Sequence, residues 1–366
     1  METEKSSASR GNRLSSLHQL EEKCVREYRK YADTVAVSYA VYNLFTKNPE
    51  IANFVGIEHK LKNIENTDIR PDIVVTYEND QKGMIFELKW SLPLDDELLE
   101  REIRGLRRYA ISCSNWRKPS DNVDFHDLVL ICHIDDAQRT VDIIKRISNE
   151  SNCDFLKKEG FAVWSWTITA PKKGQRKEEL RLFPVYGKTR NRKVETLIRK
   201  PGGILFPEDV LTFLRFSFTF VREKPPVQYT MTVLVQNIFP SFQQKPYRDY
   251  YKIHTDLIYE RAKIFFPSWH EFDAKTIQIK RGWIREALGK LLEINLCEKM
   301  LGKPDWWSIP IPTLQTKKPF QTALCRKTSQ EYLKRTKKRR APGRPRVRPL
   351  RHKRQPSEKP LNGWMK

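Results

Sequence analysis

Two runs rich in β-branched and aromatic residues, 73–77 and 84–90, limit the architectures open to this chain. Each run favours a strand, and the turn-forming residues 78–83 between them predict a hairpin. An amphipathic helix is expected over 94–112, because three acids open it at the positive end of the helix dipole. Residues 128–134 form a continuous apolar run, which is typical of a buried parallel strand. This order of elements predicts an α/β fold.

Further elements flank this segment. A helical period over residues 16–45 ends before Asn48-Pro49, and a shorter helix is expected over 141–147. A second hairpin is predicted from runs 161–169 and 179–185, and Gly202-Gly203 indicates a domain boundary. We therefore predict four segments: a disordered N-terminus over 1–16, an α/β domain over 17–203, a mostly α domain over 204–312 and a basic, Pro-rich, disordered tail over 313–366.

The positive charge of the chain is concentrated near its C-terminal end. The 366 residues carry 68 Lys and Arg against 45 Asp and Glu, a net charge of +23, and residues 317–366 account for +16 of it. A segment of this composition cannot bury enough apolar surface to fold alone, and it is either a solubilising tail or an arm that binds a polyanion. Gly343-Arg344-Pro345 resembles the core of an AT-hook, which implies minor-groove contacts by neighbouring arginines. They are Arg340, Arg344 and Arg346.

Three polar residues of the first predicted hairpin carry the candidate chemistry. In a strand alternate residues share a face, so Glu87 and Lys89 lie opposite the apolar series Met84, Phe86, Leu88 and Trp90. Pairing of the two strands brings Asp72 close to Glu87. Two converging carboxylates repel each other unless a cation lies between them, and Mg²⁺ suits such a site. The alternative is an exposed strand face with a weak cross-strand ion pair.

Pro71-Asp72, then 14 residues, then Glu87-Leu88-Lys89, between an upstream helix and a following helix and strand, resembles the PD-(D/E)xK nuclease superfamily. The resemblance implies a restriction-endonuclease-like αβββαβ core and Mg²⁺ as cofactor, with Mn²⁺ as the alternative ion. It further implies that Asp72, Glu87 and the Leu88 carbonyl bind the metal. Lys89 would orient or deprotonate the attacking water, or stabilise the pentacovalent phosphate.

Two further features of that superfamily are only partly matched. Many members place an acid on the first helix, and Glu27 is favoured here over Glu21 and Glu22. Some branches carry Gln-x-x-x-Tyr on the helix after the lysine, but here Gly105 stands four residues before Tyr109. The same helix carries four arginines, which either contact phosphates or form a solvated face. They are Arg101, Arg104, Arg107 and Arg108.

The C-terminal half is expected to be rich in helices. Helices are predicted over 207–222, 228–239, 256–266 and 284–300, followed by a basic turn and a short strand over 306–309. Helix, turn, helix and β-wing over residues 225–312 resemble a winged helix-turn-helix. The resemblance implies that the last helix and the wing bind DNA, with ordinary surface charge as the alternative. The residues expected to contact DNA are Arg281, Arg285, Lys290 and Lys303.

Together these features predict a Mg²⁺-dependent DNA endonuclease that acts on duplex DNA. The alternatives are an inactive DNA-binding regulator or assembly subunit, and an RNA-binding or RNA-cutting protein that stacks bases on Trp164, Trp166, Trp306 and Trp307. Six scattered cysteines without a CxxC pair, and no apolar run of membrane-spanning length, predict an intracellular protein. It would be cytoplasmic or nucleoid-associated, or nuclear in a nucleated host. Double-strand cleavage favours a homodimer without requiring one.

Overall fold

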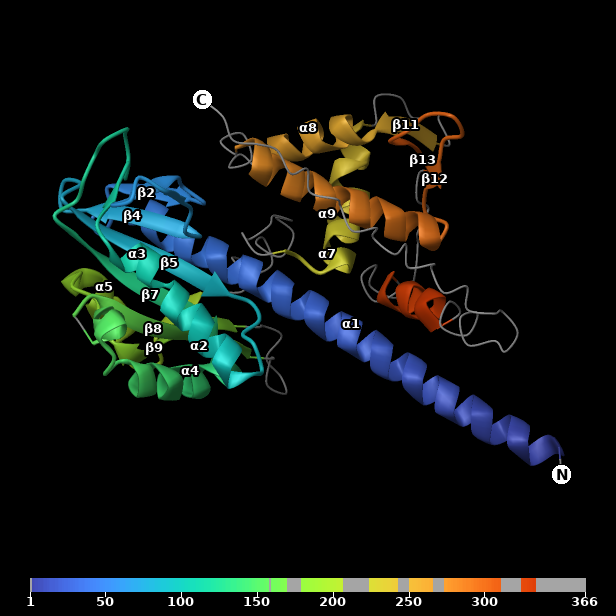
Figure 1. The fold of residues 1–366 in the computed structure, drawn as a ribbon, viewed down its shortest axis with the longest axis horizontal. Helices are drawn as coiled ribbons and strands as arrows, with labels where there is room; N and C mark the ends of the chain where they lie inside the picture. The colour runs from blue at the N-terminus through green and yellow to red at the C-terminus, as the bar shows by residue number, and fades with distance from the viewer. Residues whose placement is uncertain are drawn as a thin grey trace, which may run out of the picture.

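The computed structural model describes residues 2–157, 159–169, 179–206, 224–242, 250–265, 273–310 and 324–333. Two halves, each with its own core, lie along one long helix, α1 (Glu2–Thr46), which Figure 1 shows running from the N-terminus to the large sheet. Residues 2–16, which we expected to be disordered, form the first turns of α1. They contain no proline, so a helix nucleated farther along extends through them. The expected end before Asn48-Pro49 agrees with the last helical residue, Thr46.

A seven-stranded mixed sheet forms the N-terminal half. Neighbours among the first three strands are antiparallel, and the next two strands run parallel to the third. The sixth strand is antiparallel to the fifth, and the seventh is antiparallel to the sixth. In spatial order they are β1 (Phe54–Ile57), β4 (Ile73–Tyr77), β5 (Lys82–Lys89), β7 (Phe125–His133), β8 (Phe161–Thr169), β9 (Glu179–Gly187) and β10 (Ile204–Phe206). Three short strands form a separate small sheet, β2 (Leu61–Asn63), β3 (Asp68–Ile69) and β6 (Cys113–Ser114).

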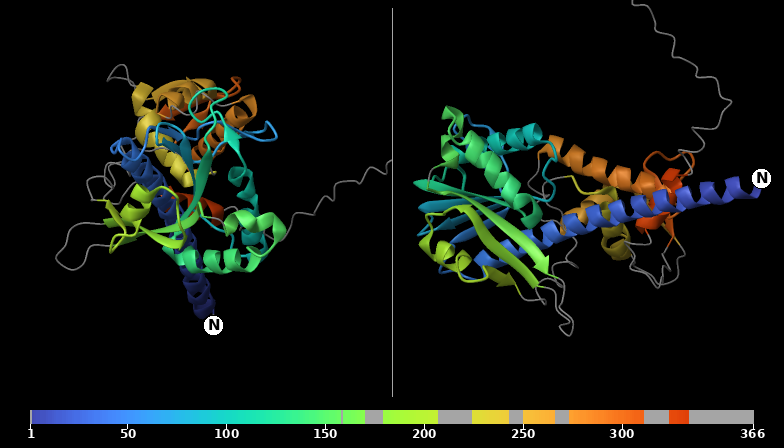
Figure 2. Two further views of the ribbon diagram at one scale, coloured as in Figure 1. Left: turned by 90° about the vertical axis from the view of Figure 1, so that its left-hand side faces the viewer. Right: turned by 90° about the horizontal axis from the view of Figure 1, so that it is seen from below.

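Helices cover the two faces of the large sheet, as the right-hand view of Figure 2 shows. One face packs on the second half of α1, where Phe86 contacts Phe45 with their ring centroids 5.3 Å apart. The other face packs on four short helices. They are α2 (Asp96–Gly105), α3 (Arg107–Ala110), α4 (Ile134–Ile147) and the 3₁₀ helix Ser151–Leu156. Both faces of β5 are therefore buried, as expected for a central strand.

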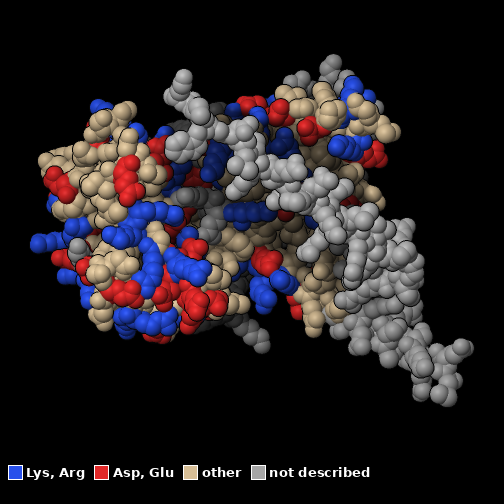
Figure 3. All heavy atoms as spheres, in the orientation of Figure 1, with Lys and Arg blue, Asp and Glu red and all other residues tan. Residues whose placement is uncertain are grey.

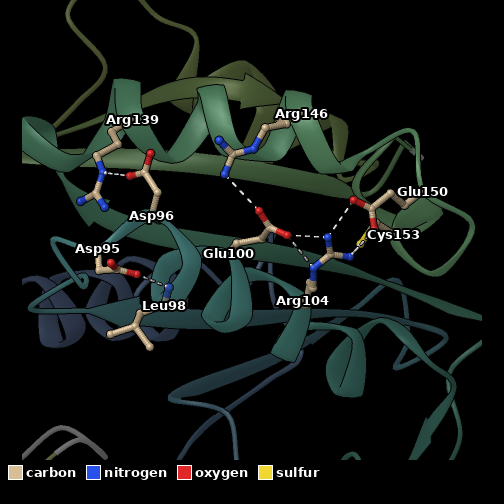
Figure 4. A network of polar contacts seen from close by, with 9 residues as sticks. All are labelled: Asp95, Asp96, Leu98, Glu100, Arg104, Arg139, Arg146, Glu150 and Cys153. Atoms are coloured by element: carbon tan, nitrogen blue, oxygen red, sulfur yellow. Dashed lines mark hydrogen bonds and ion pairs between the residues drawn. The ribbon is translucent and has the colours of Figure 1, made fainter.

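The helix expected over 94–112 is divided in two at Leu106, directly after Gly105, because glycine is a poor helix former. Asp95 caps the first part by accepting the Leu98 N–H at 2.9 Å. A charge network then fastens α2 to α4 (Figure 4): Glu100 accepts from Arg104 at 2.6 Å and from Arg146 at 3.0 Å. These hydrogen bonds, led by that of Arg104, lower the pKa of Glu100.

The boundary expected at residue 203 lies farther along the chain. Strand β10 pairs with β9, Ile204 opposite Leu182, so the N-terminal half extends through Phe206. Gly203 has a φ of +73°, and a side chain there would meet the Leu182 carbonyl at 2.0 Å. The two glycines thus form a turn inside the domain rather than a linker. A short helix, α5 (Arg192–Ile198), packs on the same sheet.

The C-terminal half packs helices on a three-stranded sheet of order β11-β13-β12. Its elements are α7 (Val227–Val233), a π-helical continuation Leu234–Ile238, the 3₁₀ turn Pro240–Phe242, β11 (Tyr250–His254), α8 (Thr255–Phe265), α9 (Ala274–Glu293), β12 (Glu298–Lys299) and β13 (Trp306–Pro310). Helix α9 begins ten residues before the predicted start, because Asp273 caps it by accepting the Thr276 N–H at 2.8 Å. The helix expected over 207–222 lies outside the described residues.

Part of the segment expected to be a disordered tail is folded. Residues 324–333 are helical, with Leu324 and Cys325 buried against the core of the C-terminal half and α1. The AT-hook-like segment, with Arg340, Arg344 and Arg346, lies outside the described residues. Within the part of the chain that the structure describes, we find no helix with the length and apolar character of a membrane crossing.

Candidate active site

The first hairpin places Asp72 and Glu87 on the same face of the large sheet. Ile73 and Phe86 form the end pair of the β4–β5 register. Asp72 and Glu87, the next residues outward on the two strands, therefore stand opposite each other. The next residues on that face, Val74 and Ile85, pack in the core beneath α2 and α4. Asp72 Oδ2 accepts the Leu88 backbone N–H at 2.6 Å, which fixes the carboxylate beside the neighbouring strand. The predicted strand pairing thus brings the two acids together.

Lys89 completes the predicted cluster. Its Nζ lies 3.3 Å from Glu87 Oε1, with both side chains on the strand face that is turned toward α2. The three residues are almost fully enclosed: the exposed fractions are 3% for Asp72, 2% for Glu87 and 8% for Lys89. An exposed strand with a weak ion pair, the alternative interpretation of this motif, does not fit such burial. Charges this deep are expected only where they are paired or bind a ligand.

Two side chains from the helices above the sheet extend the cluster. Glu102 of α2 places Oε2 at 3.5 Å from Lys89 Nζ, and Arg108 of α3 places Nη2 at 3.8 Å from Glu87 Oε1. Arg108 was among the arginines expected to contact phosphates, whereas Glu102 was not predicted. Its position three residues after Leu99 on an amphipathic helix was the available signal, because Leu99 is buried against the sheet. Both added side chains are about half exposed, so they connect the enclosed acids with the protein surface.

The donor atoms of this cluster suit a hard divalent cation. Glu87 Oε2 is buried, and no hydrogen-bond partner for it lies within the described residues. An unpaired buried carboxylate oxygen is costly, and a metal ion would satisfy it. Among the described residues no three His, Cys, Asp or Glu side chains gather closely enough to bind a metal alone. A site built on Asp72 and Glu87 would therefore complete its shell with carbonyl, water or phosphate oxygens, as Mg²⁺ commonly does.

The cluster lies at the end of the sheet that faces the C-terminal half. Trp90, which directly follows β5, packs on the core of that half, and its ring centroid lies 5.6 Å from that of Tyr31 on α1. Lys280 of α9 lies 4.0 Å from Glu58, whose N–H donates to the Asp72 carbonyl. The cluster therefore lies beside the junction between the two halves.

Other residues considered for this site lie elsewhere. Glu27 is half exposed on α1 and contacts Lys23 at 3.9 Å, on the helix that covers the opposite face of the sheet. Tyr109 is buried, and its hydroxyl donates to the Arg70 carbonyl at 3.5 Å. Arg104 belongs to the charge network that joins α2 to α4. Within the described residues, neither Glu27 nor Arg104 forms a hydrogen bond or ion pair with Asp72, Glu87 or Lys89.

The four DNA-contact residues predicted in the C-terminal half differ in exposure. Arg281 is largely enclosed, with Nη2 3.4 Å from Asp256 and its guanidinium over the Tyr259 ring, so it stabilises the fold between α8 and α9. Arg285 is exposed on α9, with Asp305 4.0 Å from its Nε.

Lys290 lies five residues after Arg285 on α9, and Lys303 follows the helix. Lys290 pairs with Glu293 at 2.8 Å. Lys303 is exposed in the turn between β12 and β13, and its ammonium lies over the Trp306 ring. Arg285 and Lys303 are therefore exposed, Lys290 is partly exposed, and Arg281 is largely enclosed.

The tryptophans proposed for stacking on RNA bases are mostly internal. Trp164 and Trp166 are buried in the core between the sheet and α1, and Trp307 donates its indole N–H to Thr255 Oγ1 at 2.9 Å inside the C-terminal half. Trp306 alone of the four is partly exposed.

Comparison of the chain with protein-family models, curated proteins and solved structures finds no match.

Proposed function

We propose that this protein is a Mg²⁺-dependent endonuclease that hydrolyses phosphodiester bonds in duplex DNA. The observation that carries the proposal is the enclosed cluster of Asp72, Glu87 and Lys89, in which one Glu87 oxygen is buried without a hydrogen-bond partner among the described residues. Acid, acid and lysine on adjacent strands of an α/β sheet are the arrangement of the PD-(D/E)xK nucleases, and the αβββαβ order from α1 to β7 is compatible with that core.

The side chains of the cluster suggest separate roles in metal binding, water orientation and phosphate binding. Asp72, Glu87 and the Leu88 carbonyl would hold the ion. Bound there, Mg²⁺ would lower the pKa of a coordinated water and neutralise charge on the scissile phosphate. Lys89 is held at the edge of the acids by Glu87 and Glu102, where its ammonium can orient the attacking water. Arg108 is exposed at the entrance and can pair with a phosphate oxygen.

The C-terminal half supports DNA as the substrate. Its order of helix, strand, two helices and two strands, with a three-stranded sheet, is compatible with a winged-helix domain. Arg285 is exposed on α9, and Lys303 lies in the turn that would form the wing. Figure 3 shows Lys and Arg side chains in the hollow between the halves and on the neighbouring surface of the N-terminal half. Positive charge beside an acidic site suits a phosphate backbone.

Plasmid cleavage tests the proposal directly. Purified protein is incubated with supercoiled plasmid in Mg²⁺, in Mn²⁺ and with a chelator, and nicked and linear products are quantified. Glu87→Gln should lower the cleavage rate by about 10²-fold or more while DNA binding is retained. Glu97→Gln, at an exposed position on α2, is the matched control and should cut like the parent. Equal cleavage by the Glu87→Gln variant would refute the assignment of the site.

An inactive DNA-binding protein on the same scaffold is the second candidate. The direct ion pair between Glu87 and Lys89 at 3.3 Å favours it, because mutual neutralisation is the ordinary role of such a pair. DNA binding without metal-dependent cleavage under every tested ion would support this candidate instead. The third candidate is an RNA-binding or RNA-cutting protein, which the burial of Trp164 and Trp166 disfavours. Structured RNA added as a competitor of DNA binding tests it.

A further inference from the structure

Glu58 is the neighbour of Asp72 on the side away from Glu87. Ile57 pairs with Ile73 between β1 and β4, so Glu58 stands opposite Asp72, and its N–H donates to the Asp72 carbonyl at 2.9 Å. Its backbone has a φ of +47°, in the left-handed region that non-glycine residues seldom occupy. Such a conformation persists only where the surroundings enforce it, and it concentrates at functional sites.

The side chain of Glu58 faces a lysine of the C-terminal half. Lys280 of α9 places its Nζ 4.0 Å from Glu58 Oε1, and the exposed fractions of the two residues are only 3% and 4%. The ammonium also lies 3.9 Å from the ring centroid of Trp283, one turn along the helix. Burying two charges costs desolvation that their attraction seldom repays in full. A buried pair that joins two halves therefore points to a role in fixing their register.

A second contact holds the same segment. Arg70, which lies two residues before Asp72 in the chain, donates from Nη1 to the Glu58 carbonyl at 3.1 Å. The pKa of Asp273, the capping residue of α9, is lowered first by the Thr276 N–H that it caps and also by the charge of Arg70. The start of α9 thus lies near Arg70, two residues before Asp72, and its second turn lies near Glu58, which stands opposite Asp72 on the neighbouring strand.

We propose that Lys280 is a positioning residue of the candidate active site, which holds Glu58 and thereby the Asp72 backbone, so that the site is complete only while α9 is docked. This inference rests on the proposed nuclease function. Docking of α9 then couples the half that would bind DNA to the acids that would bind metal. Residues that orient metal ligands typically contribute 10–100-fold to metal affinity.

The test compares Lys280→Met, Glu58→Gln, the double variant and the control Lys275→Ala, an exposed lysine of the same helix. Mn²⁺ binding is measured from the electron paramagnetic resonance signal of free Mn²⁺, with a Glu87→Gln sample to identify the site. The half-maximal Mg²⁺ concentration for plasmid cleavage is measured in parallel, and circular dichroism verifies folding.

Each single variant should weaken Mn²⁺ binding and raise the Mg²⁺ requirement by about tenfold or more, because the pair no longer fixes Asp72. The double variant leaves no buried charge alone, so it should fold better than Lys280→Met. It should still show the weakened metal binding, which separates positioning from stability. Lys275→Ala should match the parent in every measurement.

The outcomes separate the two proposals. If the parent cuts DNA and the folded double variant binds Mn²⁺ as tightly as the parent does, the positioning role of Lys280 is wrong and the nuclease stands. If the parent shows neither cleavage nor Glu87-dependent Mn²⁺ binding, both proposals fall. Weaker binding in the double variant, with an unchanged control, supports both.

Discussion

Replacing Asp72 by alanine and by asparagine separates its structural role from its proposed chemical role. The Asp72 carboxylate accepts the Leu88 N–H at 2.6 Å in a nearly closed site. Alanine leaves that buried N–H without its acceptor, at a cost of about 1–3 kcal/mol. Asparagine keeps an oxygen that can accept the same bond but carries no charge, so its cost should stay within about 1 kcal/mol. Both variants should lose cleavage, because neither supplies an anionic oxygen to a cation.

Urea unfolding followed by far-ultraviolet circular dichroism measures the stability difference. With a denaturant slope of about 3 kcal/mol per M, the alanine variant should unfold about 0.3–1 M urea below the parent. The asparagine variant should stay close to the parent, and Asp124→Ala, at an exposed position, serves as control. Equal destabilisation by alanine and asparagine would refute the hydrogen-bond argument. Parental cleavage by the asparagine variant would refute the need for charge at this position.

Three further predictions concern the rest of the molecule. Leu288→Ala, at a fully buried position in the C-terminal core, should lower the free energy of unfolding by about 2–5 kcal/mol, measured by urea titration. Burial lowers the pKa of His126 below its ordinary 6.5, against the raising effect of its bond to the Tyr109 carbonyl. Below about pH 6.5 the unfolded chain therefore takes up a proton that the folded protein resists, so the free energy of unfolding should decrease as the pH is lowered. Unfolding curves at pH 7.5 and 5.5 measure this decrease, which should be smaller in His126→Gln. Removal of residues 334–366, which carry 14 Lys and Arg, should make the dependence of DNA affinity on salt less steep, measured by fluorescence anisotropy between 50 and about 200 mM salt; an unchanged slope would exclude tail contacts with phosphate.

Local patterns were sufficient for the strands that carry the site. The runs 73–77 and 161–169 have the predicted bounds, because β-branched and aromatic residues end sharply at turn-forming ones. Period-two alternation also predicted which face carries Glu87. Once the hairpin pairs, the position of Asp72 follows from its register, so this part of the site needed no tertiary information.

The remaining features depend on contacts between distant segments. Gly202-Gly203 has the composition of a linker, yet the chain returns to the sheet at once as β10 because β9 offers a free edge to pair with. The early start of α9 depends on the Asp273 cap, and its Gly282 lies mid-helix without ending it. Glu102 reaches the site through the packing of α2 on the sheet, and its position three residues after Leu99 was the sequence signal for it. Glu58 stands beside Asp72 because β1 pairs with β4, two strands that are separated in the chain by β2 and β3.

The course of α1 explains why a site at the end of β5 lies beside the second half. Tyr28, Tyr31 and Val35 belong to the C-terminal core, whereas Ala36 and Phe45 belong to the core beneath the sheet. One rigid helix thus passes from one core into the other within a single turn, and it does so next to Trp90, one residue beyond Lys89. Rotation of one half about this junction would strain α1 and the Glu58–Lys280 pair together. DNA bound by the C-terminal half would consequently act on the position of the acids through packed side chains rather than through a flexible linker.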